Sequence, residues 1–172
     1  MAGFYGQEKC LIDRNGRVRL PTRLVDDFRQ VDGLQVVLHR LPENALAIYP
    51  VSTWRKMRAG DARPEVMAGR SLGYRRQLRR AGGFMQEDCL SNQGRITIPV
   101  LFRQSLDLLP GTPVVLVGCE IGVEVWNASA WQKECEAIME YERARSEAEM
   151  RREIEGDGSR VRGDGVGEGK SS

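Results

Sequence analysis

The sequence has few of the residue types from which catalytic and metal sites are commonly built. It contains a single histidine, His39, and four cysteines that are scattered along 172 residues without a C-x-x-C pair. These numbers argue against a metal site and against a disulfide framework, and we expect the four thiols to be small buried side chains. No nucleophile-and-base pattern, phosphate-cradling glycine loop or cofactor fingerprint is present. The sequence therefore predicts no catalytic residue, no metal, no cofactor and no small-molecule substrate.

Long apolar runs are also missing. The apolar stretches fall far short of the ~20 residues needed to span a bilayer, and residues 1–5 (MAGFY) lack the charged and apolar regions of a secretory signal. We therefore expect a cytoplasmic protein with no membrane partner. A hydrophobic content of 41% permits a packed core, and a chain of this length forms one ordinary domain or two small ones.

Charge of the two signs is unevenly distributed. Of the 26 Lys and Arg and 24 Asp and Glu, residues 1–80 hold 16 and 8 (a balance of +8), and residues 81–172 hold 10 and 16 (a balance of −6). Nearly all cations of the first part are arginines, which suit bidentate contact with phosphates and guanine edges better than lysines do. The first part of the chain therefore favours a polyanionic partner.

The chain contains one long internal repeat. Residues 11–21 (LIDRNGRVRLP) recur in variant form as residues 90–99 (LSNQGRITIP). A single register aligns Gly16 with Gly94, Arg17 with Arg95, Val18 with Ile96, Pro21 with Pro99, and residues 36–38 with 114–116. After one deleted residue it also aligns Tyr49 with Trp126 and Trp54 with Trp131. A repeat longer than the ~20 to 50 residues of solenoids, present twice, predicts a duplicated domain.

Each copy predicts the same order of elements. Segments 9–12 and 17–20 alternate polar and apolar residues around an Asn-Gly turn, so we expect them to pair with each other as a tight hairpin. A short helix should begin at Pro21 and bury Leu24, Val25 and Phe28. Segments 34–39 and 45–49 then predict a second hairpin. In the second copy the corresponding segments are 84–90, 95–98, the helix 99–106, and the hairpin 114–117 with 122–126.

Three further helices are expected. Ser52 or Thr53 should cap a short one, and a single helix should run from Pro64 to Arg80. A longer helix should start at residue 127 or 129, with apolar spacing that fades after Tyr141. We divide the chain into a first repeat (1–58), a linker and basic helix (59–83), a second repeat (84–143), an exposed helix end (144–155) and a glycine-rich disordered tail (156–172).

The two strand-turn-strand-proline-helix units, with D-x-x-x-R in the first, resemble the MraZ family of bacterial regulators of the division and cell-wall gene cluster, over about residues 1–143. The resemblance implies an α+β fold: two pseudo-symmetric AbrB/SpoVT-like swapped-hairpin units with short helices form a β-barrel-like core, followed by a longer C-terminal helix. It further implies a nucleoid-associated repressor that binds double-stranded promoter DNA at tandem direct-repeat boxes. The implied assembly is a homo-oligomeric ring, octameric or larger.

The resemblance also assigns site residues, and the two motifs differ. Asp13 and Arg17 occupy the family motif in the first repeat, whereas Ser91 stands where the second motif normally has Asp. Serine can accept a backbone N–H but brings no charge to orient Arg95. We therefore expect the first motif to make the larger share of DNA contact. The expected DNA-binding residues are Arg14, Arg17, Arg19 and Arg95, and the expected turn residues are Asp13, Asn15, Gly16, Ser91 and Gly94.

Several residues have a second interpretation. The Asp13–Arg17 pair can brace its own turn in addition to any contact with DNA. The arginines of segment 75–80 form a phosphate clamp, a solvated helix face, or a contact with the acidic half of a neighbouring subunit, and we favour the contact. The tryptophans are expected to pack helix against hairpin, and His39 to be structural. The alternative function is an antitoxin-like module, because MazE-type antitoxins share the swapped-hairpin unit; two copies and a tail without hydrophobic anchors weigh against it.

Overall fold

The computed structural model describes residues 3–60 and 63–160, with side chains described as far as residue 155. The chain divides into two compact units, Met1–Trp131 and Gln132–Ser172. The first unit contains all the strands of the described chain, and the second contains most of the last helix. The elements are β1 (Gln7–Leu11), β2 (Arg17–Arg19), α1 (Thr22–Val31), β3 (Gln35–Arg40), β4 (Leu46–Pro50), α2 (Val51–Arg58), α3 (Pro64–Arg70), α4 (Leu72–Gly83), β5 (Met85–Cys89), β6 (Arg95–Thr97), α5 (Val100–Ser105), β7 (Pro113–Gly118), β8 (Val123–Asn127) and α6 (Ala128–Arg160).

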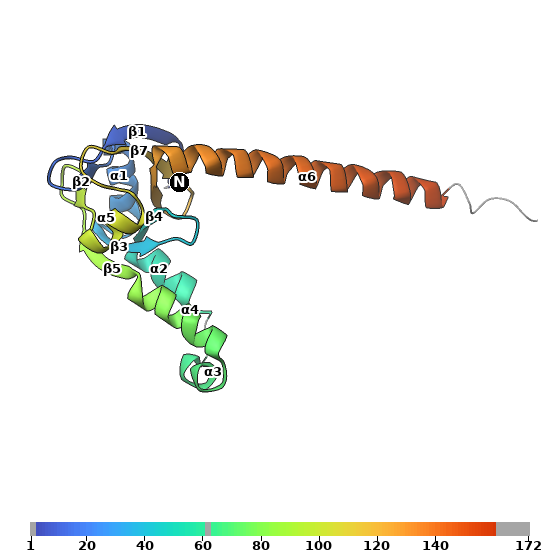
Figure 1. Ribbon diagram of the computed structural model, residues 1–172, viewed down its shortest axis with the longest axis horizontal. Helices are drawn as coiled ribbons and strands as arrows, with labels where there is room; N and C mark the ends of the chain where they lie inside the picture. The colour runs from blue at the N-terminus through green and yellow to red at the C-terminus, as the bar shows by residue number, and fades with distance from the viewer. Residues whose placement is uncertain (1–2, 61–62, 161–172) are drawn as a thin grey trace, which may run out of the picture. The chain divides into compact units, whose positions relative to one another are not determined.

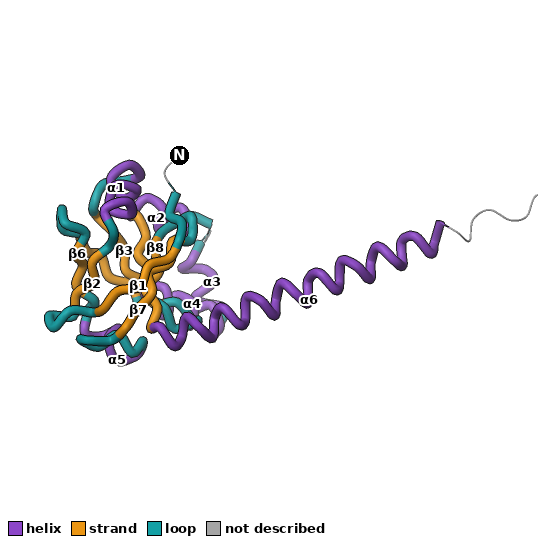
Figure 2. The backbone as a smooth tube through the Cα atoms, turned by 90° about the horizontal axis from the view of Figure 1, so that it is seen from above, coloured by secondary structure: helices purple, strands orange, loops and turns teal. Residues whose placement is uncertain are grey.

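The fold is mixed α+β, with an open antiparallel sheet and a C-terminal helix. Six strands form the sheet in the order β1-β7-β8-β4-β3-β5, and β2 and β6 form a separate two-stranded ribbon. Figure 1 labels β1, β7, β4, β3 and β5 of the sheet, together with β2 of the ribbon. Figure 2 shows this ribbon beside the sheet, with α1 on one side of it and α5 on the other. The β3–β4 and β7–β8 hairpins meet at the centre of the sheet, where Ala47 of β4 pairs with Glu124 of β8.

The hairpins expected from segments 34–39 and 45–49, and from 114–117 and 122–126, are confirmed as β3–β4 and β7–β8. Their apolar runs are buried on both faces, because α-helices and the ribbon cover what the sheet would otherwise expose. The helix expected after Pro21 is confirmed as α1, with Leu24, Val25 and Phe28 buried. Tyr49 lies near Trp54, with ring centroids 6.3 Å apart, and Trp126 lies 5.5 Å from Trp131. The tryptophans therefore pack hairpin against helix at equivalent places, as expected.

The hairpin expected between segments 9–12 and 17–20 is wrong. The turn is present, with Asp13 N–H donating to the Arg17 carbonyl (2.9 Å) and Gly16 N–H to the Asp13 carbonyl (2.9 Å). Beyond it the strands separate: β1 pairs with β7 of the other repeat, and β2 pairs with β6. In the same way β5 pairs with β3 and not with β6. Alternation in a sequence determines which face of a strand is buried, but it does not identify the strand that pairs with it.

Two smaller expectations about helices also need correction. Neither Ser52 nor Thr53 caps α2, which begins after Pro50; the Ser52 N–H instead donates to Asp32 Oδ2 (2.6 Å). The helix expected from Pro64 to Arg80 is two helices, because Ser71 is extended and its Oγ accepts the Tyr74 N–H (3.1 Å), which caps a new helix.

The four thiols are less buried than expected. Cys89 is exposed at the end of β5, an edge strand, and the other three cysteines are only partly buried. Partial burial nevertheless raises the pKa of the Cys10 thiol to about 11 and that of Cys119 to about 12, so both are protonated at neutral pH.

The long C-terminal helix begins as expected. Asn127 Oδ1 accepts the backbone N–H groups of Ser129 (2.9 Å) and Ala130 (3.3 Å), which makes Asn127 its cap. The helix continues to Arg160, beyond residue 156 where the disordered tail was expected to begin. The rest of that tail, residues 161–172, lies outside the described residues. Among the helices that are described, none combines the length and apolar character needed to cross a bilayer.

Candidate nucleic-acid interface

The β2–β6 ribbon brings the two repeated motifs into contact. Its antiparallel register places Arg17 opposite Thr97, Val18 opposite Ile96, and Arg19 opposite Arg95. Val18 and Ile96 are 1% and 3% exposed, so they form the inner face of the ribbon. Because successive side chains of a strand point to opposite faces, the three arginines share the outer face.

A reciprocal pair of hydrogen bonds joins the two turns. The Leu20 N–H donates to the Gly94 carbonyl, and the Ile98 N–H donates to the Gly16 carbonyl, both at 2.8 Å. Gly16 and Gly94 are buried and have φ angles of +74° and +77°, a region that favours glycine. Each turn glycine is therefore needed for its own turn and for the strand end of the other repeat.

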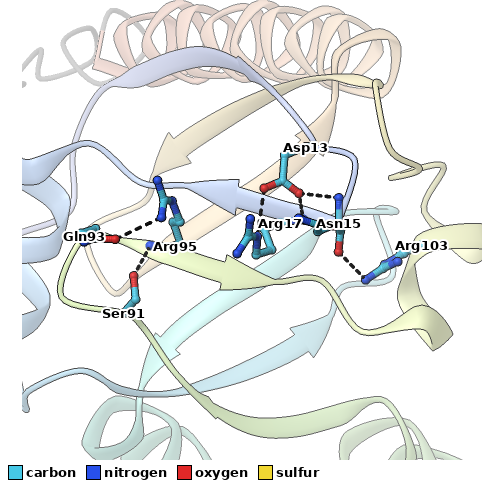
Figure 3. A network of polar contacts seen from close by, with 7 residues as sticks. All are labelled: Asp13, Asn15, Arg17, Ser91, Gln93, Arg95 and Arg103. Atoms are coloured by element: carbon cyan, nitrogen blue, oxygen red, sulfur yellow. Dashed lines mark hydrogen bonds and ion pairs between the residues drawn. The ribbon is translucent and has the colours of Figure 1, made fainter.

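Asp13 organises the first turn. Its Oδ1 accepts the backbone N–H groups of Asn15 (2.8 Å) and Arg17 (2.9 Å), and its Oδ2 accepts Nε–H of Arg17 (2.9 Å). The bracing role considered from sequence is thus present. The bond to Asp13 uses Nε of Arg17, and a guanidinium has a second edge, formed by its two terminal nitrogens, that can pair with a phosphate or a guanine. Figure 3 shows this turn at one end of the ribbon and the turn of Ser91 at the other.

The second turn has the same backbone arrangement without a charge. Ser91 Oγ accepts the Arg95 N–H (3.0 Å), which confirms that serine replaces aspartate as the backbone acceptor. The Arg95 guanidinium donates from Nη1 to the neutral Gln93 Oε1 (3.1 Å). Arg95 is exposed, so it is positioned by an amide where Arg17 is positioned by a carboxylate.

Two further arginines contact the turns, and sequence reasoning missed both. Arg103 of α5 donates from Nε to the Ile98 carbonyl (2.7 Å) and from Nη2 to the Asn15 carbonyl (3.3 Å), so it joins the second repeat to the first turn. Arg29 of α1 donates to the Asn92 carbonyl (3.0 Å) and joins the first repeat to the second turn. The repeat register contained a signal for the first of them, because it aligns Arg103 with apolar Val25.

The outer face of the ribbon is electrostatically unfavourable without a partner. Arg19 and Arg95 are directly opposite and exposed, and like charges in that position repel. Within the described part of the chain, the carboxylate that bonds to a ribbon arginine is that of Asp13. An anion placed over the ribbon would relieve the repulsion. Arg14, the fourth expected contact, is exposed at the first turn.

The pKa of Asp13 predicts an acid-sensitive first turn. It lies below its ordinary 3.8, chiefly because the carboxylate accepts the Arg17 backbone N–H, with the Arg17 side chain and the Asn15 N–H adding to the effect. Because the folded pKa is below the unfolded one, the contribution of this carboxylate is complete above the unfolded pKa and is lost as pH falls through the folded pKa. We expect the amide NMR signals of Asn15 and Arg17 to shift only at acid pH, below 3.8.

The serine turn provides the control for this titration, because a hydroxyl does not ionise in this range. The Arg95 amide signal should stay constant over the same acid range, and Asp13→Asn should remove the transition at Arg17. A transition at Arg17 with its midpoint above the ordinary aspartate value would contradict the assignment.

The basic segment 75–80 lies on α4, away from the ribbon strands in sequence. Arg75 donates from Nη1 to the Ala68 carbonyl (2.8 Å) and so bridges α4 to α3, while Arg76, Arg79 and Arg80 are exposed. Among the described residues, no group of three or more His, Cys, Asp or Glu side chains is arranged to hold a metal ion.

The three arginines on the outer face of the ribbon support electrostatic and hydrogen-bond recognition of an anion.

Comparison with known proteins identifies relatives that match most of this chain. A family model described as "MraZ protein, putative antitoxin-like" matches residues 87–153. The chain is 31% identical to the transcriptional regulator MraZ of Azoarcus sp. (strain BH72) over 136 residues, which is 79% of this chain and 88% of that protein. It is 34% identical over 134 residues to the transcriptional regulator MraZ of Cutibacterium acnes, covering 78% and 88% of the two chains.

Proposed function

This chain belongs to the MraZ family of transcriptional regulators, and we propose that it binds double-stranded promoter DNA through the outer face of the β2–β6 ribbon. The single observation that carries the proposal is the register of the ribbon. It places Arg17, Arg19 and Arg95 on one face, with two of them directly opposite each other. Guanidinium groups in this arrangement can donate hydrogen bonds to phosphates, which are negatively charged, and to the acceptor atoms of guanine edges.

Arg17 and Arg95 are the proposed base-reading or groove-inserted residues, and Arg14 and Arg19 the proposed phosphate contacts. The structural roles of the turns support this division. Asn15, Gly16 and Gly94 shape backbone that carries the arginines, while Asp13 and Ser91 accept the N–H of the arginine four residues later. The first motif has two further arginines where the second has Asn92 and Thr97, which supports a larger share of DNA contact for the first.

The exchange of strands between repeats supports assignment of the fold to the AbrB-like swapped-hairpin class. In this assignment the repeats are residues 1–58 and 84–143, joined by segment 59–83. The first strand of each repeat, β1 or β5, completes the hairpin of the other. The six-stranded sheet and the ribbon would then together correspond to the barrel-like core of that class.

We further propose that the protein acts as a homo-oligomeric ring on tandem direct-repeat boxes. A ribbon with three residues in each strand covers little DNA, so a single protomer should bind weakly. Joining several ribbons in a ring raises the effective concentration of each after the first has bound, provided that box spacing matches subunit spacing. Binding of the ring to these boxes at the promoter of the division and cell-wall operon would repress the operon. The protein would then act at the nucleoid, in the cytoplasm.

Footprinting and titration on the region upstream of the chain's own gene test the proposal. We expect protection of short boxes repeated in one orientation, and an affinity whose logarithm falls linearly with the logarithm of salt concentration. Inserting five base pairs between boxes rotates the next box by about half of the 10 to 10.5 base-pair turn, and should weaken binding. Equal affinity for this region and for an unrelated duplex at every salt concentration would contradict sequence-specific regulation.

The description of the matching family model as antitoxin-like supports a second candidate, a module that binds a toxin protein. It would use the same swapped-hairpin unit to bind protein in place of DNA. Purification of the native protein together with a small ribonuclease, and inhibition of that ribonuclease by the pure chain, would favour this candidate.

A further inference from the structure

A hollow of about 410 Å³ lies among α2, α4 and the β3–β4 hairpin, within the first unit of the chain. Its volume falls in the range of about 300 to 1,000 Å³ that is typical of small-molecule sites. We call it the α2–α4 pocket. The lining residues that matter here are His39, Tyr49, Trp54, Arg58, Tyr74 and Arg80.

One residue that lines this pocket, Tyr74, has a buried polar atom without a partner. Among the described residues, the buried side-chain nitrogen and oxygen atoms that lack a hydrogen-bond partner are Tyr74 Oη and Arg40 Nε. Tyr74 lines the pocket, and Arg40 lines a smaller hollow of about 260 Å³ that shares Arg80 with it. Buried polar groups in native proteins are almost always hydrogen-bonded. The unpartnered Tyr74 hydroxyl therefore points to a polar occupant.

Aromatic side chains form one wall of the pocket. The centroid of the Trp54 ring lies 4.8 Å from that of His39 and 6.3 Å from that of Tyr49. The planes of the Trp54 and Tyr49 rings are inclined to each other by only 17°. Tyr74 adds a fourth ring to the lining. Flat π-systems pack favourably against such walls, in stacked or edge-to-face geometry.

The charged groups of the lining are cationic. Arg58 and Arg80 line the pocket, and no aspartate or glutamate is among its described lining residues. His39 Nδ1 lies 3.2 Å from the Phe84 carbonyl, which only accepts hydrogen bonds, so Nδ1 carries the hydrogen and Nε2 is an acceptor. Burial first, and then the charges of Arg80 and Arg58, lower the pKa of His39, so the ring is neutral at physiological pH. The pocket therefore favours an occupant with an anionic group.

The pocket is not a by-product of the duplicated fold. The repeat register aligns His39 with Val117 and the Tyr49–Trp54 pair with Trp126–Trp131, yet α4, which closes the pocket, belongs to the segment between the repeats. Tyr74, Arg80 and His39 therefore have no counterparts in the second repeat.

We propose that the α2–α4 pocket binds a small aromatic anion of the size of a nucleoside monophosphate. The ring would lie against Trp54 and Tyr74, the anionic group would pair with Arg80, and the Tyr74 hydroxyl would hydrogen-bond to the ligand. This site is separate from the β2–β6 ribbon and adds a ligand-binding function to the proposed binding of DNA.

Titration calorimetry of the full chain with AMP, GMP, CMP, UMP and 4-nitrophenyl phosphate tests the proposal. We expect saturable binding of at least one of these, together with quenching of tryptophan fluorescence that is lost in Trp54→Phe. The matching nucleoside without phosphate, and inorganic phosphate without a ring, should each bind about tenfold more weakly or less, because each makes only part of the contacts.

Variants distinguish this pocket from nonspecific attraction to a basic protein. Tyr74→Phe and Arg80→Ala should each weaken binding about tenfold, since each removes a hydrogen bond to a charged or polar group of the ligand. Arg79 precedes Arg80 in α4 and is not among the lining residues of the pocket. Arg79→Ala removes the same charge as Arg80→Ala and should leave binding unchanged, as should Arg17→Ala on the ribbon. Absence of binding by every probe at millimolar concentration, or equal weakening by Arg79→Ala and Arg80→Ala, would overturn the proposal.

Discussion

Arg17→Ala is expected to abolish measurable binding to the promoter at physiological salt while the oligomer stays intact. Truncating an arginine that contacts DNA costs about 1 to 3 kcal/mol per contact, and in a ring the loss recurs at every bound subunit. The fold should be preserved, because the Arg17 side chain is about 38% exposed and packs into no core. Fluorescence anisotropy with a labelled promoter duplex measures the affinity, and size-exclusion chromatography with light scattering measures the assembly.

Two comparisons make the result specific. Arg55→Ala removes one exposed arginine from α2, away from the ribbon, and should change affinity only slightly. Arg95→Ala should weaken binding less than Arg17→Ala, because the second motif lacks the neighbouring arginines of the first. A larger loss from Arg95→Ala would reverse the ranking of the two motifs, and wild-type binding by Arg17→Ala would remove the ribbon from the mechanism.

Gly94→Ala is expected to destabilise the fold by about 2 to 5 kcal/mol. A left-handed backbone costs a non-glycine residue about 1 to 2 kcal/mol, and Gly94 has a φ of +77°. The new Cβ would also lie 2.6 Å from Val25 Cγ2 and 2.7 Å from the Leu20 carbonyl oxygen, and such overpacking adds about 1 to 3 kcal/mol. Leu20 is the residue whose N–H bonds to the Gly94 carbonyl, so the collision falls on the hydrogen bond that joins the two motifs.

The chain offers a matched control for this substitution. Gly111 has a φ of +82° and no atom within 4 Å of an added Cβ, so Gly111→Ala should show only the backbone cost of about 1 to 2 kcal/mol. Gly16→Ala should fall between them, since the added Cβ meets the end of the flexible Arg103 side chain. Denaturant unfolding at one protein concentration measures all three. Equal loss from Gly94→Ala and Gly111→Ala would show that the close approach of Leu20 does not matter.

Much of the local structure could be predicted because it depends on short-range chemistry. The glycines of the two turns, the helices after Pro21 and Pro99, and the buried Leu24, Val25 and Phe28 all follow from turn geometry, fixed φ angles and helical spacing. The replacement of Asp13 by Ser91 as backbone acceptor was predictable for the same reason. The break at Ser71 was missed, because a cap inside an apparently continuous helix competes with propensities of similar strength.

The sequence by itself determined the duplication, the two turns, and the alternation that buries Val18 and Ile96 and exposes arginines beside them. Only the tertiary structure decided that β2 pairs with β6, which sets Arg19 opposite Arg95 and brings Arg103 onto the first turn. The physical reason is that a turn and an alternating pattern are local properties, whereas the choice of a partner strand depends on how much apolar surface is buried between segments almost eighty residues apart.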